Sequence, residues 1–173
     1  MQDIKVSRRY FLKSGGAAAA VVGAAAVPMT ASAAVPAGVG TTTLPYPKKA
    51  VGKRSTIVLN TATSFSYPDE SSSCYVIRMG HVVPGGVGAD KDIVAYSAMC
   101  THMGCPVVYD NGVRVFKCHC HFSMFDPENG GQMICGQATE NLPKILLEYD
   151  ASSDTVSAVG IDGLLYGRQS NLI

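Results

Sequence analysis

The sequence carries little net charge and no block of like charge. Among its 173 residues, 14 lysines and arginines nearly balance 13 aspartates and glutamates, which leaves a formal net charge of +1. There is no internal repeat and no long charged run. Proteins that bind nucleic acid carry a clustered basic surface, so we expect no nucleic-acid partner.

Long apolar runs are also absent. The most apolar stretch, residues 14–27, is alanine-rich and is interrupted by Pro28, whereas a membrane-spanning helix needs about 20 consecutive apolar residues. The stretch follows Ser-Arg-Arg-Tyr-Phe-Leu-Lys at residues 7–13 and precedes Ala-Ser-Ala, which ends at Ala33. This order is typical of a twin-arginine export signal. We therefore expect a signal peptide at residues 1–33, cleavage after Ala33, and export of the folded protein to the periplasm. An uncleaved signal that anchors the chain to the membrane is the alternative.

The remaining residues, 34–173, are enough for one domain with its own apolar core. Without residues 1–33 the chain loses four basic residues and one acidic residue, so its net charge falls from +1 to −2. A segment rich in Gly, Thr and Pro, residues 35–53, begins this domain and predicts an extended arm.

Sustained helical periodicity is absent after the signal. Short apolar or alternating runs separated by turn residues predict strands instead. They lie at residues 55–59, 74–78, 93–96, 107–109, 113–116, 145–149 and 155–159. Asp110-Asn111-Gly112 predicts a hairpin turn between two of them, and residues 150–154 predict a second turn. The fold class is therefore all-β.

Cysteine and histidine are few, but most of them lie in two short segments. Cys100-x-His102 is followed after fifteen residues by Cys118-x-x-His121. Two thiolates and two imidazoles on two loops can bind a binuclear iron-sulfur cluster, with both sulfurs on one iron and both nitrogens on the other. A structural zinc site accepts the same ligand types, but zinc fingers place two cysteines in one knuckle and two histidines on a helix. The interleaved order favours the cluster.

The two segments, Cys-Thr-His-Met-Gly-Cys at residues 100–105 and Cys-His-Cys-His-Phe-Ser at residues 118–123, resemble the cluster-binding boxes of the Rieske family. The resemblance implies a Rieske fold, an antiparallel sheet sandwich with a small cluster-binding subdomain at about residues 99–143. It also implies one-electron transfer by one [2Fe-2S] cluster per chain. The implied ligands are Cys100, His102, Cys118 and His121.

Each box contains a second cysteine, and the resemblance implies a disulfide between Cys105 and Cys120. Such a bridge would join the two ligand loops and stabilise the fold by about 3 kcal/mol through restriction of the unfolded chain, and an oxidising periplasm permits it. The other two cysteines, Cys74 and Cys135, are either thiols or a second bridge. His119 stands where the family usually has proline, and we expect it not to be a ligand.

Two positions near the second box are expected to tune the reduction potential, because hydrogen bonds to cluster sulfurs stabilise the reduced form. Ser123 stands where high-potential Rieske proteins carry a serine donor. Phe125 stands where they carry a tyrosine, which implies one donor fewer and a lower potential than in quinol-oxidising relatives. In residues 134–139, which resemble the loop that covers the cluster, Gln137 replaces a proline.

Three kinds of Rieske protein are candidates for the identity of this chain. Ring-hydroxylating dioxygenase ferredoxins are cytoplasmic and lack the second cysteine pair. The Rieske subunit of a quinol-cytochrome c oxidoreductase has that pair but needs a durable membrane anchor. Residues 121–143 look like the small subunit of periplasmic arsenite oxidase. That resemblance implies an oxidoreductase in which a large molybdopterin-containing subunit holds the catalytic centre. This chain would then relay electrons to a soluble c-type cytochrome or copper protein.

Overall fold

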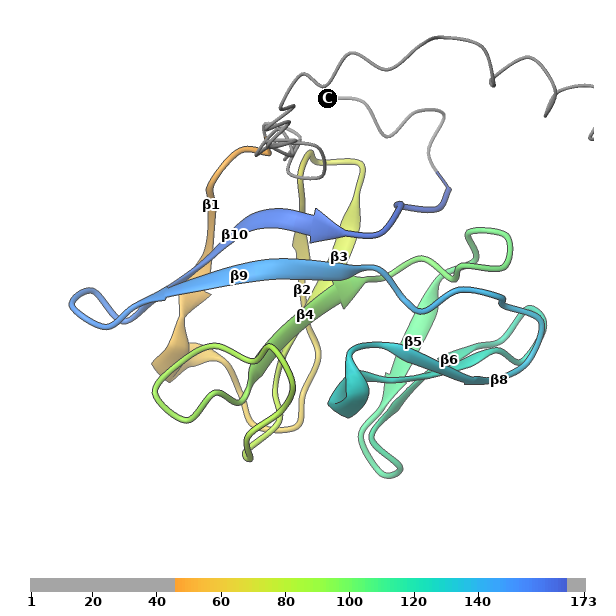
Figure 1. The fold of residues 1–173 in the computed structure, drawn as a ribbon, viewed down its shortest axis with the longest axis horizontal. Coiled ribbons are helices and arrows are strands. Elements are labelled where there is room, and N and C mark those ends of the chain that lie inside the picture. The colour runs from red at the N-terminus through yellow and green to blue at the C-terminus, as the bar shows by residue number, and fades with distance from the viewer. Residues whose placement is uncertain (1–45, 168–173) are drawn as a thin grey trace, which may run out of the picture. The chain divides into compact units, whose positions relative to one another are not determined.

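The computed structural model describes residues 46–167 of the chain (Figure 1). The predicted export signal and the first part of the expected arm lie outside the described residues. Between residues 46 and 167 no helix is long and apolar enough to cross a membrane. The elements in this range are β1 (Lys49–Lys53), the 3-10 helix η1 (Arg54–Thr56), β2 (Thr63–Ser66), β3 (Ser73–Arg78), β4 (Ile93–Ser97), β5 (Val107–Asp110), β6 (Val115–Cys118), β7 (Met124–Asp126), the 3-10 helix η2 (Pro127–Asn129), β8 (Gln132–Cys135), β9 (Lys144–Asp150) and β10 (Thr155–Asp162).

The strands form two antiparallel sheets, so the all-β prediction is confirmed. The large sheet has six strands in the order β1-β10-β9-β4-β3-β2. The small sheet has four strands in the order β5-β6-β7-β8, and Figure 1 shows its strands in green and teal beside the large sheet. The whole small sheet is inserted in the chain between β4 and β9, which are themselves paired.

The core is divided into two clusters because strand residues alternate between the two faces of the large sheet. Every residue of β4 is buried. Val94 and Tyr96 belong to a cluster that both sheets share, whereas Ile93 and Ala95 belong to a cluster on the large sheet alone. The shared cluster also contains Phe116 of β6, whose ring centroid lies 6.0 Å from that of Tyr96 in an edge-to-face contact. This contact joins the small sheet to the large one.

The two predicted hairpins are present, although one turn differs in detail. Thr155 pairs with Asp150 at the end of the β9–β10 hairpin, as expected. In the β5–β6 hairpin the loop has four residues, 111–114, between the paired residues Asp110 and Val115. The Asp110 carboxylate accepts the Gly112 backbone N–H at 2.9 Å, and the left-handed residue is Arg114, with φ 59°, rather than the glycine.

The predicted strand at residues 55–59 is wrong. Strand β1 lies earlier, in the segment expected to be an arm, and η1 follows it. The β9–β10 turn explains the difference, because Asp154 accepts the Ser55 N–H on its side chain at 3.0 Å and the Arg54 N–H on its carbonyl at 2.9 Å. The chain bends at this point, and the preceding residues pair with β10. Strands β2, β7 and β8, of three or four residues each, were not predicted.

Candidate metal centre

The first ligand loop follows β4 and is closed by its own backbone. The Cys100 N–H donates to the Cys105 carbonyl at 2.8 Å, and the Gly104 N–H donates to the Cys100 carbonyl at 2.8 Å. Gly104 has φ 72°, and a Cβ at this position would lie 2.9 Å from the Cα of Gly167. The tight turn therefore requires glycine, and it holds His102 at the outer end of the loop.

The second ligand loop connects β6 to β7. The Cys118 N–H donates to the Ser123 carbonyl at 2.8 Å and closes the loop. Phe122 turns the chain with φ 60°, in the left-handed region that non-glycine residues seldom adopt. Its side chain is 76% exposed. The loop keeps Cys118 buried at the end of β6 and leaves His121 exposed.

The four proposed ligands come together as two pairs. The Nδ1 atoms of His102 and His121 are 3.2 Å apart, and the two rings are nearly perpendicular. Cys100 and Cys118 are both buried, and Cys118 is close enough to add to the rise in the pKa of the Cys100 thiol that burial causes. The two imidazole nitrogens therefore form one pair near the surface, and the two sulfurs belong to buried residues.

The chemistry of this donor set fits a binuclear iron cluster. Burial raises the pKa of the Cys100 thiol, and contact with Cys118 raises it further, while the Ser123 hydroxyl acts in the opposite direction. Two adjacent thiolates in such a place are stable only when a cation compensates their charge. Iron supplies that charge, and thiolate on one side with imidazole on the other matches the division between the two irons of a mixed-ligand cluster.

The disulfide expected between the second cysteines of the two boxes is present. Cys105 and Cys120 are bonded, with their Cα atoms 6.5 Å apart. Both sulfurs lie within 4.8 Å of the Cys118 Sγ. Of these three sulfur atoms only that of Cys118 can become a thiolate, so the group is no separate metal site. The bridge joins the two ligand loops and covers the buried thiol of Cys118.

A third loop, at residues 136–140, packs directly on the ligand loops. Gly136 has φ 102°, and a Cβ there would lie 2.3 Å from the Ser123 Cα. The Ser123 hydroxyl oxygen accepts the N–H groups of Gln137 at 3.1 Å and Ala138 at 3.0 Å. A proline at position 137 would lack that N–H, so Gln137 gives the loop a hydrogen bond in place of a rigid ring.

One residue between the ligands was missed from the sequence. Thr101 is buried, and its hydroxyl donates to the Glu140 carbonyl at 2.7 Å. It holds the far end of the third loop against the first ligand loop. No sequence signal indicates this contact, because the partner is a backbone carbonyl 39 positions away. Gly136 was also missed, although a glycine beside a predicted covering loop is a reason to suspect a close backbone approach.

The remaining candidates are separate from the metal site or act only as packing. Phe125 is fully buried and belongs to the same apolar cluster as Cys100 and Cys118. His119 is exposed. Cys74 is a buried free thiol whose Sγ lies 3.5 Å from the Tyr67 carbonyl oxygen. Cys135 is a free thiol at the surface, so these last two cysteines form no second bridge.

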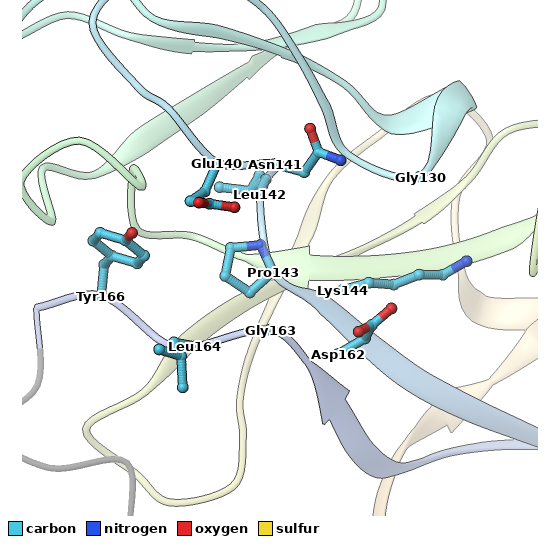
Figure 2. A pocket seen from close by; sticks show the side chains of 10 residues that line it. All are labelled: Gly130, Glu140, Asn141, Leu142, Pro143, Lys144, Asp162, Gly163, Leu164 and Tyr166. Carbon is cyan, nitrogen blue, oxygen red and sulfur yellow. The ribbon is translucent and has the colours of Figure 1, made fainter. Parts of the chain in front are cut away.

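A cavity of about 460 Å³ lies where the third loop runs into β9 (Figure 2). Glu140, Lys144, Asp162, Leu164 and Tyr166 are among its lining residues, and none of the lining residues is a cysteine or histidine. The Lys144 ammonium already donates to the Pro84 carbonyl at 2.8 Å. The cysteine and histidine donors that an iron-sulfur cluster of this type needs are therefore at the loop tips and not in this cavity.

Comparison with known proteins agrees with this geometry. Residues 50–146 match the family model of the Rieske [2Fe-2S] domain. The iodate reductase subunit IdrB of Denitromonas iodatirespirans is 37% identical over 169 residues, which are 96% of this chain and 86% of that protein. The iodate reductase subunit IdrB of Pseudomonas sp. (strain SCT) is 34% identical over 168 residues, 95% of this chain and 84% of that protein.

The same fold occurs in the soluble domain of the Rieske protein II (soxF) from Sulfolobus acidocaldarius. The TM-score is 0.61 at 21% sequence identity, over 74% of this chain and 83% of that one. One assignment follows from the family match, from the two relatives that align with nearly the whole of this chain, and from the shared fold. This chain belongs to the Rieske [2Fe-2S] family and is an electron-transfer protein that carries a Rieske-type cluster.

Proposed function

We propose that this chain is the electron-transfer subunit of a periplasmic oxidoreductase, and that a larger molybdopterin-containing subunit holds the catalytic centre. We propose Cys100, His102, Cys118 and His121 as the cluster ligands. The observation that carries this proposal is the pair of Nδ1 atoms 3.2 Å apart, on the same two loops as the buried thiols of Cys100 and Cys118.

Each residue of the site has a separate task. The cluster supplies a one-electron couple when it is bound. Cys100 and Cys118 hold its inner side away from water, whereas the two histidines are the ligands nearest the surface. Electron tunnelling is fastest over the shortest distance, so His102 and His121 are the point at which electrons leave or reach the chain. The Cys105–Cys120 bridge keeps the two loops together throughout the redox cycle.

Two substrates are candidates for the catalytic partner. The resemblance of residues 121–143 to the arsenite oxidase small subunit favours arsenite, with electrons passed outward to a c-type cytochrome or a copper protein. The two iodate reductase subunits, each similar over nearly the whole chain, favour iodate. In that case electrons would pass inward through this chain, because reduction of iodate consumes them. Both candidates assign the same relay to this chain.

The complex purified from its native cells separates these candidates. A large molybdenum-containing protein should co-purify with this chain. Arsenite added to the oxidised complex should then produce the paramagnetic signal of the reduced cluster. If iodate is the substrate, iodate should instead remove that signal from a complex that was reduced beforehand. A cytochrome b partner in place of the molybdenum protein would contradict the proposal and support a quinol-oxidising complex.

The proposed route to the periplasm is tested separately. Replacing Arg8 and Arg9 by lysine should retain the protein in the cytoplasm at its full precursor length, because the twin-arginine pair is the recognised signal. Lys5→Arg is the matched control and should be exported and processed normally. Normal export of the double variant would contradict the assigned route.

A further inference from the structure

Two segments that both reach the first ligand loop form most of the wall of the cavity in Figure 2. Residues 140–144 form one part, and the carbonyl of the first of them accepts the Thr101 hydroxyl at 2.7 Å. Residues 162–166 include the other part, and the chain continues from them to Gly167, whose Cα would lie 2.9 Å from a Cβ placed on Gly104. Thr101 directly precedes a proposed cluster ligand. The cavity therefore lies beside a loop at which we propose that electrons leave or reach the chain.

The charges that line this cavity do not cancel. Glu140 and Asp162 are acidic, and Lys144 is the only basic residue among the described residues of the lining. Burial lowers the pKa of the Lys144 ammonium, and the nearby Asp162 carboxylate opposes that effect. Glu140 is exposed, its carboxylate has no ion-pair partner in the part of the chain that the structure describes, and Figure 2 shows it on the other side of Pro143 from Lys144. The cavity therefore holds one carboxylate in excess and attracts a cation.

The uncharged part of the lining suits the stem of a long basic side chain. Leu164 is 66% exposed, and the rings of Pro143 and Tyr166 also line the cavity. An arginine side chain packs its methylene groups on such a surface, binds a carboxylate through two N–H groups and stacks on an aromatic ring. The volume of about 460 Å³ exceeds that of one side chain. The cavity can therefore hold a short peptide segment that carries the arginine.

The surface next to the cavity is typical of a protein interface. Met103 of the first ligand loop is 72% exposed and Phe122 of the second is 76% exposed, and each follows a proposed histidine ligand directly in the sequence. Protein interfaces combine an apolar centre with a polar rim, and electron exchange requires close approach to the two histidines. A protein occupant therefore explains both the apolar residues and the cavity beside them, whereas a small molecule explains only the cavity.

We propose that the cavity receives an arginine-bearing segment of the protein with which this chain exchanges electrons, and that the Glu140 carboxylate binds the guanidinium group. The contact fixes the partner beside His102, because the Glu140 backbone is itself held to Thr101. The inference rests on the proposed function, which makes the large molybdenum-containing subunit this partner.

A small probe tests the cavity without the partner. N-acetyl-L-arginine amide is titrated into the full chain with its cluster oxidised, and the backbone amides of Lys144 and Gly163 are followed by NMR. Both amides should shift in the wild type and should shift much less in Glu140→Gln at the same probe concentration. N-acetyl-norleucine amide, which has the stem without the charge, is the control and should cause little shift. No shift in the wild type up to the solubility limit of the arginine probe, or an equal shift in the variant, would overturn the inference.

The affinity for the partner is the second measurement. Glu140→Gln should weaken binding to the isolated large subunit by about fivefold at low salt, the upper range for one exposed ion pair, and Glu140→Arg should weaken it further through like-charge repulsion. Glu148→Gln is the matched control, because it removes the same charge from β9, where Glu148 pairs with Lys48 at 2.7 Å outside the cavity. It should leave the affinity unchanged, and visible absorption should show the cluster in every variant. Equal affinities of the wild type and Glu140→Gln would overturn the inference.

Two further outcomes would identify a different occupant or a different partner. Glu140→Gln should weaken binding to the same extent in an Arg168→Gln background. If the effect disappears there, the arginine comes from this chain itself and the inference is overturned. If the large subunit does not co-purify, the proposed function fails, and the probe titration then decides whether the cavity takes an arginine-bearing segment of another partner.

Discussion

The two sheets are stabilised in different ways. In the large sheet, β9 and β10 have seven and eight residues, and side chains that alternate between faces bury a continuous apolar cluster. In the small sheet, no strand exceeds four residues. The loops of the small sheet are held by a disulfide, by hydroxyls that bind backbone groups, and by glycines that allow close approach. The large sheet is therefore stabilised by buried apolar area, whereas the loops of the small sheet are held in place by individual contacts. Variants in the two regions should fail in different ways.

The largest effect is expected from the ligands. Cys100→Ser, His102→Ala, Cys118→Ser and His121→Ala should each lose the cluster, because each removes one of the four proposed iron ligands. Visible absorption and the low-field paramagnetic signal of the reduced protein report the loss. Cys135→Ser is the matched control, since Cys135 is an exposed free thiol, and it should retain the cluster. The ligand set would be wrong if any of the four variants kept the signal.

The large sheet should respond in stability and not in redox properties. Ile145 of β9 is fully buried in the large-sheet cluster. Ile145→Ala should lower the free energy of unfolding by about 2–5 kcal/mol through the lost apolar contacts and the cavity left behind. The iron-sulfur cluster of the folded variant should keep its reduction potential. Leu146→Ala, at an exposed position on the same strand, should have a much smaller effect on unfolding by denaturant. A changed potential in Ile145→Ala would mean that the two regions are not independent.

Removal of the Cys105–Cys120 disulfide should affect both the stability of the fold and the retention of the iron-sulfur cluster. Cys105→Ala breaks the disulfide that closes a loop with a sequence separation of 15, and should cost about 3 kcal/mol by the chain-entropy estimate. A bound cluster constrains the same loops, so the measured loss should be smaller in holoprotein than in apoprotein. The rate of cluster loss in solution should rise, since both bridge sulfurs lie within 4.8 Å of the Cys118 sulfur. Equal cluster lifetimes in variant and wild type would exclude a protective role.

A smaller effect, a shift in the reduction potential, is expected from a substitution at Phe125. Phe125→Tyr adds a hydroxyl within the apolar cluster that contains Cys100 and Cys118. A hydrogen bond from it to a cluster sulfur should raise the reduction potential, while the added atom should destabilise the packed core by about 1–3 kcal/mol. Voltammetry and denaturant unfolding measure the two effects. A lower or unchanged potential, with the cluster spectrum intact, would contradict the expected hydrogen bond.

The smallest effect concerns the β9–β10 turn. Hydrogen bonds from the Ser152 and Ser153 hydroxyls and backbone lower the pKa of the Asp150 carboxyl to about 2. A lowered pKa means that the folded state favours the charged carboxylate, so its stabilising effect is complete above the unfolded pKa near 4 and is lost as the pH falls through about 2. The stability difference between wild type and Asp150→Asn should shrink over that range. Parallel pH profiles for the two proteins would contradict this.

The sequence predicted the large sheet better than the small sheet. The reason is that buried apolar area leaves a pattern in the sequence, whereas individual contacts do not. Strands β3, β4, β9 and β10 were found because short apolar or alternating runs record burial in the large sheet. Strand β1 was missed because its pairing depends on Asp154, about a hundred positions later in the chain. Strands β7 and β8 are too short to show a period.

At the metal centre, the residues with distinctive chemistry could be selected and the supporting contacts could not. Cysteine and histidine have few other roles at such spacing, so Cys100, His102, Cys118 and His121 were selected from the sequence, as was the Cys105–Cys120 pair. Thr101 is an ordinary residue type, and its hydrogen bond depends on where the distant Glu140 carbonyl lies. Contacts between a side chain and a remote backbone group leave no pattern in a sequence.

The contact of Gly136 with Ser123 also has a genetic consequence. Every single-nucleotide missense change in a glycine codon introduces a residue with a Cβ, and a Cβ at position 136 would lie 2.3 Å from the Ser123 Cα. The left-handed backbone there, with φ 102°, disfavours the same residues. A library of random single substitutions selected for a cluster of wild-type potential should therefore return glycine alone at this codon, although the residue itself is exposed.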